Sequence, residues 1–124
     1  MNARKPSSAA PEMETRLYRA AVAATEGCEL KGATMPYTSI NGNMYSFLDK
    51  KGVVAVRLGE VERAELEQIG GEPYVHESGA AMKEYVSLPM GILSDEKRAA
   101  EWLCRSLAFA GTLKPKATAR STKA

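Results

Sequence analysis

His76 and Ser78 come nearest, by type and spacing, to a pair of residues that could do chemistry. His76 is the only histidine of the chain, and Ser78 is the nearest hydroxyl nucleophile to it. Catalysis by a serine also needs an acid that orients the base and donors that stabilise an oxyanion. The surrounding sequence identifies neither, so we expect a polar pair beside a turn. We predict no catalytic residue, and an enzyme that uses His76 or a tyrosine is the weakest of three hypotheses.

Metal and cofactor sites are not predicted either. Cys28 and Cys104 lie far apart in the sequence, and with a single histidine they match no zinc or redox spacing, so we expect two reduced thiols. The glycine pair 70–71 follows a predicted helix rather than opening one, which argues against a phosphate-binding loop. Four acidic residues gather in one short helix, where we expect a solvated face: Glu60, Glu62, Glu65 and Glu67.

Aromatic residues are numerous enough to line a ligand groove. Strand aromatics are also typical of a core or of cross-strand pairs, and the sequence leaves both alternatives open. The residues concerned are Tyr18, Tyr37, Tyr45, Phe47, Tyr74 and Tyr85.

The C-terminal end is the one segment that suggests nucleic acid. It carries four positive charges without an acid, on Lys114, Lys116, Arg120 and Lys123. So few phosphate contacts predict weak, salt-sensitive binding, and a solubilising end is the alternative. Between Pro11 and Gly111 the chain has 11 basic and 15 acidic residues, so the body itself is mildly acidic. That charge argues against a larger phosphate-binding surface.

The elements that would position these residues form one domain, because 124 residues suit a single core. We expect flexible tails at 1–10 and 113–124 and an ordered body at 11–112. Hydrophobic spacing predicts helices from 11 or 12 to 26, over 60–68 and over 95–110. Turn residues divide 33–58 into a three-stranded meander, and a second hairpin pairs 74–77 with 82–88.

The expected fold class is therefore α+β. Its order is helix, three strands, helix, two strands, helix, in two layers with a sheet of about five antiparallel strands. In the middle strand of the meander, Met44, Ser46 and Leu48 alternate with Tyr45 and Phe47. This alternation predicts that both faces of the strand carry apolar surface.

No segment reads as a membrane span, since the longest run without charge, 32–48, is broken by Pro36 and by Asn41 and its neighbours. The first residues lack the apolar region of a secretory signal. We therefore expect a cytoplasmic protein with no membrane partner.

A set of packing and turn residues resembles the N-terminal domain of the TfoX (Sxy) family, bacterial proteins linked to the regulation of competence. The resemblance runs from Met35 to Leu107 and is carried by Met35, the strands 42–47, 53–57 and 82–89, the turn 70–74, and Trp102-Leu103. It implies a two-layer α+β fold like that of bacterial secretion chaperones.

The preferred hypothesis is a non-enzymatic regulatory or adaptor domain that binds a protein partner. Three observations support it: the family resemblance, the lack of a predicted catalytic or cofactor site, and the many aromatic residues in the predicted sheet. The alternative is weak nucleic-acid association through the basic tail, as part of a transcriptional regulator. Pairing of two copies is a further expectation of the fold, because a small domain gains buried area that way.

Overall fold

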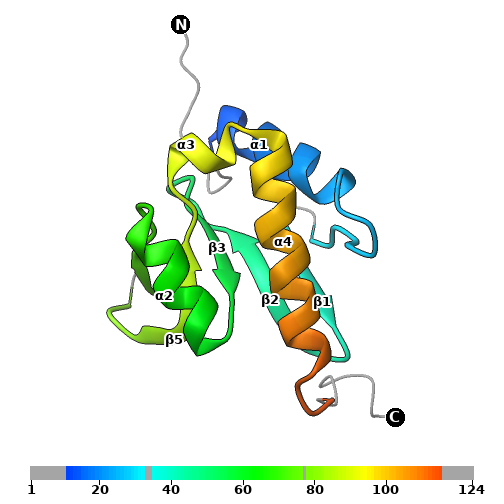
Figure 1. The fold of residues 1–124 in the computed structure, drawn as a ribbon. Helices are drawn as coiled ribbons and strands as arrows, with labels where there is room; N and C mark the ends of the chain where they lie inside the picture. Colours follow the sequence, from blue (N-terminus) through cyan, green and yellow to red (C-terminus); the bar gives the residue numbers. More distant parts are fainter. Residues whose placement is uncertain (1–10, 33–34, 77, 116–124) are drawn as a thin grey trace, which may run out of the picture.

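The computed structural model describes residues 11–32, 35–76 and 78–115, which fold into nine helices and strands (Figure 1). In chain order they are α1 (Glu12–Ala23), β1 (Tyr37–Ile40), β2 (Asn43–Leu48), β3 (Val54–Arg57), α2 (Glu60–Gln68), β4 (Pro73–Val75), β5 (Ala81–Ser87), α3 (Met90–Leu93) and α4 (Glu96–Gly111). The predicted α+β class is confirmed.

The five strands form one antiparallel sheet in the order β1-β2-β3-β5-β4. Asn41 and Gly42 connect β1 to β2 with φ angles of 54° and 81°, as a tight hairpin turn requires. Asp49 closes the β2–β3 turn, because its carboxylate accepts hydrogen bonds from the backbone N–H groups of Lys51 and Val53, both at 2.9 Å. The chain then crosses through α2, which places β5 beside β3 and leaves β4 at the edge. The predicted five-stranded antiparallel sheet is confirmed.

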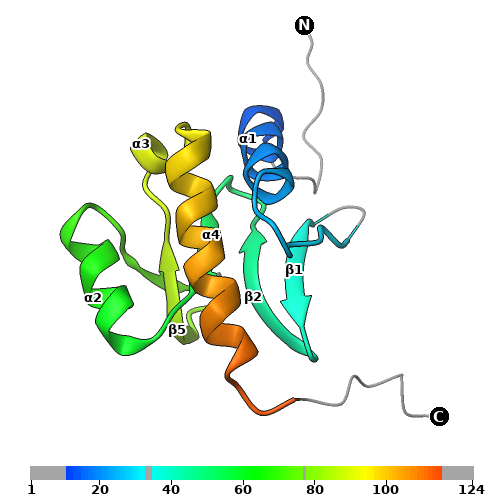
Figure 2. The same ribbon diagram turned by 45° about the vertical axis from the view of Figure 1, so that its right-hand side comes forward.

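The helices cover one face of this sheet. Figure 2 shows α4 lying across the strands, with α1 on one side of it and α2 on the other. The stripe of α4 that turns inward consists of Ala99, Trp102, Leu103, Ser106 and Ala110, all buried. Ala99, Trp102 and Leu103 of this stripe pack with Val56 and Val86 of the strands in the main hydrophobic core. Asp95 caps the helix by accepting a hydrogen bond from the Arg98 N–H at 3.3 Å; the sequence alone leaves Ser94 and Asp95 both open as the cap.

Two helices differ from the prediction. The first ends at Ala23 rather than 26, because the Thr25 hydroxyl and backbone N–H bind the carbonyls of Ala21 and Val22 and turn the chain. The short helix α3 was not predicted at all. It follows Pro89 and buries Ile92 and Leu93, but four residues are too few to show a helical period.

The prediction that both faces of β2 carry apolar surface is confirmed, since Leu48 joins the main core and Phe47 the opposite face, but the expected side of Met44 is wrong. The register pairs Thr38 with Ser46 but Ser39 with Met44, so Tyr45 is an extra residue that makes a β-bulge. As a result Met44 and Phe47 share the face without helices, while Tyr45 donates its hydroxyl to Cys28 Sγ on the helix side at 3.3 Å. Without the bulge, Met44 would point into the main core.

Three fully buried hydroxyls join α1 to the sheet. The Ser46 hydroxyl lies 2.6 Å from the Tyr18 hydroxyl and 2.5 Å from the Thr38 hydroxyl. Burial raises the pKa of Tyr18 well above its ordinary value of 10.0, because the phenolate would lose its hydration.

The raised pKa of Tyr18 predicts that the folded protein loses stability in alkaline solution. Folded protein holds the phenol proton while the unfolded chain releases it above pH 10.0, so the free energy of unfolding is intact below that pH and falls above it. We expect one such tyrosine to contribute a fall of about 1.4 kcal/mol per pH unit. Urea unfolding between about pH 8 and about pH 11 measures this slope, and Tyr18→Phe should make it shallower. An identical slope for both proteins would contradict the assignment.

Among the described residues, no helix is long and apolar enough to cross a membrane.

Candidate binding groove on the uncovered sheet face

A second apolar cluster lies on the sheet face that the helices leave open. Phe47 of β2 stands at its centre, with its ring 5.0 Å from the Tyr74 ring in an edge-to-face arrangement and 5.4 Å from the Tyr85 ring. Such pairs stabilise a fold by about 0.5–1.5 kcal/mol beyond the area they bury. The cluster thus ties β2 to β4 and β5 across the sheet.

The hydroxyls of the two tyrosines in the cluster donate hydrogen bonds to other groups of the protein. Tyr74 donates to Asp49 Oδ2 at 2.7 Å, and Tyr85 donates to the Met44 carbonyl at 2.6 Å. Both tyrosines are buried, and burial raises the pKa of Tyr85. Because their polar ends are engaged, the two tyrosines present carbon rather than hydroxyl to the open side.

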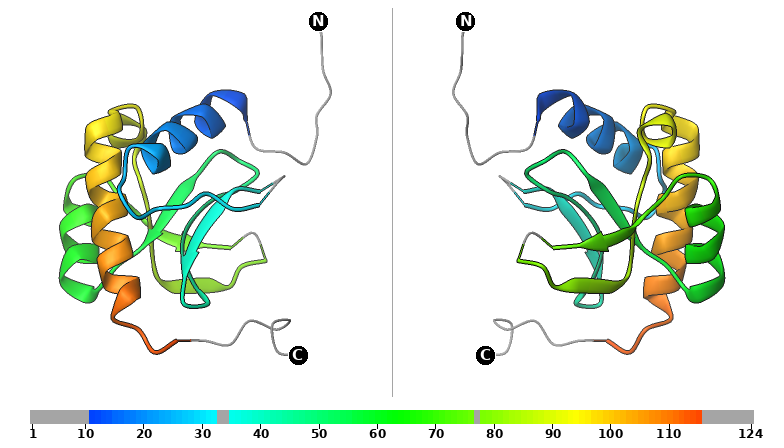
Figure 3. Two further views of the ribbon diagram at one scale, coloured as in Figure 1. Left: turned by 90° about the vertical axis from the view of Figure 1, so that its right-hand side faces the viewer. Right: turned by 90° about the vertical axis from the view of Figure 1, so that its left-hand side faces the viewer.

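A groove with a volume of about 650 Å³ lies over this cluster. Figure 3 shows α2 and α4 on one side of the sheet and the strand hairpins extending away from them. The residues that line the groove belong to the strands, their turns and the chain just before β1. Its apolar lining includes three methionines and three further side chains: Met35, Met44, Met82, Tyr37, Val53 and Val75. Most are half-buried, and Val75 is 55% exposed. This volume is in the range of sites that enclose organic ligands or side chains.

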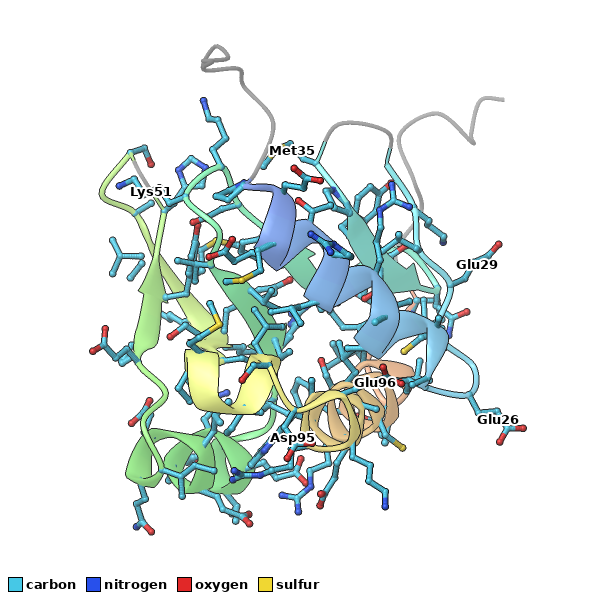
Figure 4. The ribbon with its side chains drawn as sticks, turned by 90° about the horizontal axis from the view of Figure 1, so that it is seen from above. Glu26, Glu29, Met35, Lys51, Asp95 and Glu96 are labelled. Carbon is cyan, nitrogen blue, oxygen red and sulfur yellow. The ribbon has the colours of Figure 1, made fainter. Side chains whose placement is uncertain are left out.

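Charged residues stand at the rim of the groove. Lys50 and Lys51 belong to the β2–β3 turn, and Glu72 and His76 flank β4. Figure 4 shows Lys51 and Met35 on the opposite side of the molecule from Asp95 and Glu96, at the start of α4. With Asp49, the groove lining carries two lysines and two carboxylates, so its charges balance.

The aromatic residues singled out in the sequence divide between the two faces. Tyr37, Phe47 and Tyr74 line the groove and Tyr85 supports it, whereas Tyr18 and Tyr45 face the helices. Sequence reasoning did not assign Met35, Met44 and Met82 to a groove. The only available signal was that Met44 and Met82 lie in strands beside aromatic residues, which is equally typical of a core.

His76 and Ser78 lie close together at the turn between β4 and β5. His76 Nδ1 is 3.0 Å from the Ser78 hydroxyl and accepts a hydrogen bond from the Ser78 backbone N–H at 3.1 Å. Both residues are exposed. No acid is seen to orient the imidazole in the described part of the chain, so the pair matches the expected polar turn.

Neither the cysteines nor the acidic residues of α2 form a metal site among the described residues. Cys28 is half-buried, which raises the pKa of its thiol, and Cys104 is exposed; both are free thiols. Arg105 of α4 lies 3.3 Å from Glu65 and 4.0 Å from Glu62, and Glu60 and Glu67 are exposed. Within residues 11–32, 35–76 and 78–115, no group of three potential ligands could hold a metal ion.

Of the four basic residues proposed for nucleic acid, the structure describes only Lys114. Its side chain is exposed, and its backbone carbonyl accepts a hydrogen bond from Asn43 Nδ2 at 3.1 Å. Lys116, Arg120 and Lys123 lie outside the described residues, as do residues 1–10 of the expected N-terminal tail. Nucleic-acid binding stays a prediction.

Comparisons with family models, with curated proteins and with solved structures found no match for this chain. The resemblance to the TfoX N-terminal domain therefore stays a prediction.

Proposed function

We propose that this domain is a non-enzymatic regulatory or adaptor module, and that the groove on its uncovered sheet face binds a partner protein. The observation that carries the proposal is the Met- and aromatic-lined groove of about 650 Å³ on a face without helices. The resemblance to the TfoX N-terminal domain supports a regulatory role of this kind.

The composition of the groove favours a protein partner. Apolar surface that is gathered into one concave patch with a charged rim is typical of protein interaction sites, unlike apolar residues scattered singly. Methionine side chains are flexible and polarisable, so they adapt to the shape of an incoming apolar side chain. The turn geometry of His76 and Ser78 offers no support for a reaction at this place.

Photo-crosslinking at two valines tests the proposal. A photoreactive amino acid replaces Val75, which lines the groove and is 55% exposed, or Val61, which lies on α2 and is 79% exposed. In the cells that make this protein, we expect a crosslinked product of discrete mass from position 75 and none from position 61. Equal products at the two positions, or none at either, would contradict the proposal.

A further inference from the structure

We infer that α2 is a hinged helix that opens from the sheet while the rest of the fold stays closed, and that Arg105 of α4 is the latch that holds it. This conformational device is independent of the groove and goes beyond the proposed function. It follows from the burial of α2, from its two ends and from the charged side chains that hold it.

Helix α2 is held in the core by a single side chain. Leu66 is the one buried residue of its nine, and it lies in the main cluster with Leu58 and Val86. By contrast, α1 buries three residues and α4 buries five. Segments with few buried apolar contacts open at a lower free energy than the core does. We therefore expect α2 to open before α1 or α4.

Glycines stand at both ends of α2 and allow it to swing. Gly59 precedes the helix, and the glycine pair 70–71 follows it. Gly70 has a φ angle of 118°, which other residues rarely adopt. A few residues at the end of an element can absorb the dihedral changes of a hinge. The sheet stays joined when α2 moves, because β3 and β5 pair directly, for example at Val56 and Val86.

Arg105 connects α4 to α2 through its guanidinium group. This group lies 3.3 Å from Glu65 Oε1 and 4.0 Å from Glu62 Oε2, both on α2. On α4 itself it lies 3.0 Å from Glu101 Oε2 and 4.4 Å from the centre of the Trp102 ring. Because these last two contacts stay within α4, Arg105 keeps its place when α2 opens. Only its contacts with the two glutamates of α2 are lost.

The latch is weak and sensitive to salt. The side chain of Glu65 is 53% exposed and that of Arg105 is 29% exposed. Exposed ion pairs of this kind shift an equilibrium by only about two- to fivefold, and salt screens them. The ionic strength of the solution therefore sets how often α2 opens.

Opening of α2 would expose apolar surface of the main core. Trp102, Arg105 and Phe109 share one side of α4, since they are three and seven positions apart. That side faces α2, because Arg105 reaches its glutamates and the Phe109 ring is 3.3 Å from a Cβ built at Gly59. Trp102 is only 5% exposed in the closed form. Its ring would gain contact with solvent when α2 leaves.

Amide hydrogen exchange of the full chain, followed by NMR, tests the inference. We expect the α2 amides to exchange through an opening that is at least about tenfold more populated than the one that exposes β3 and α4. Glu65→Gln should raise the exchange rates of the α2 amides about two- to fivefold. The matched control is Glu101→Gln, which removes a close partner of Arg105 within α4 and should not raise those rates.

A double-mutant cycle tests the latch itself. With Arg105→Gln already present, Glu65→Gln should leave the α2 rates unchanged, because its partner is gone. Salt at about 1 M, where the screening length is about 3 Å, should raise the α2 rates in the unsubstituted chain but not in Arg105→Gln. Amides of α2 that exchange only together with those of β3 and α4 would overturn the hinge. Equal effects of Glu65→Gln with and without Arg105 would overturn the latch.

Discussion

Leu103→Ala is expected to lower the free energy of unfolding by about 2–5 kcal/mol, because it opens a cavity in the main core. Leu103 is fully buried on the inward stripe of α4, in the same cluster as Val56 and Val86 of the strands. Its side chain holds the helix layer against the sheet, so its neighbours cannot close the gap without moving α4.

Urea denaturation with linear extrapolation measures this loss. Val61→Ala on α2 is the control, since Val61 is 79% exposed and its truncation should change the free energy by no more than about 0.5 kcal/mol. A loss below about 1 kcal/mol for Leu103→Ala would contradict the placement of α4 on the sheet.

Gly71→Ala is expected to cost about 1–3 kcal/mol or more, through crowding rather than a cavity. A Cβ at position 71 would lie 2.7 Å from Val86 Cγ1, 2.8 Å from Leu66 Cγ and 2.9 Å from the Ser87 carbonyl oxygen. Two of these three atoms belong to the sheet strand β5, so the backbone that leads from α2 into β4 would have to shift. Glu72 and Pro73, which follow Gly71, line the groove, and we therefore expect weaker binding of the partner as well.

Gly91→Ala is the matched control for this substitution. No heavy atom lies within 4 Å of a Cβ at position 91, and the residue is in α3, where alanine favours the helix by up to about 1 kcal/mol. Thermal or urea unfolding of both variants gives the comparison. If the two substitutions had equal effects, the close contact of α2 with β5 would be wrong.

The sequence predicted the elements that have a clear period or a clear end. Helix α2 was placed at its observed residues, because Gly59 and the glycine pair 70–71 bound it. The hairpin turn was likewise predicted from Asn41 and Gly42, and the start of α4 was predicted with its cap left open between Ser94 and Asp95. These features depend on local chemistry, which a sequence carries directly.

The groove was harder to predict because it depends on contacts between distant residues. The bulge at Tyr45 places Met44 on the same face as Phe47, and no residue near it signals an extra position in the register. The six aromatic residues gave no indication of which would face the helices, since that depends on the bulge and on the hydrogen bond between the hydroxyls of Tyr18 and Ser46. Met35 joins the groove only through the course of the chain before β1.

Methyl NMR of the methionines tests the binding surface most directly. Met35, Met44 and Met82 line the groove, whereas Met13 on α1 and Met90 on α3 are outside it and 52% and 44% exposed. The full chain, labelled at the methionine methyl carbons, is titrated with the protein captured through position 75. We expect the signals of Met35, Met44 and Met82 to shift or broaden and those of Met13 and Met90 to stay unchanged. Changes confined to Met13 and Met90 would place the partner on the other side of the molecule and contradict the proposed binding face.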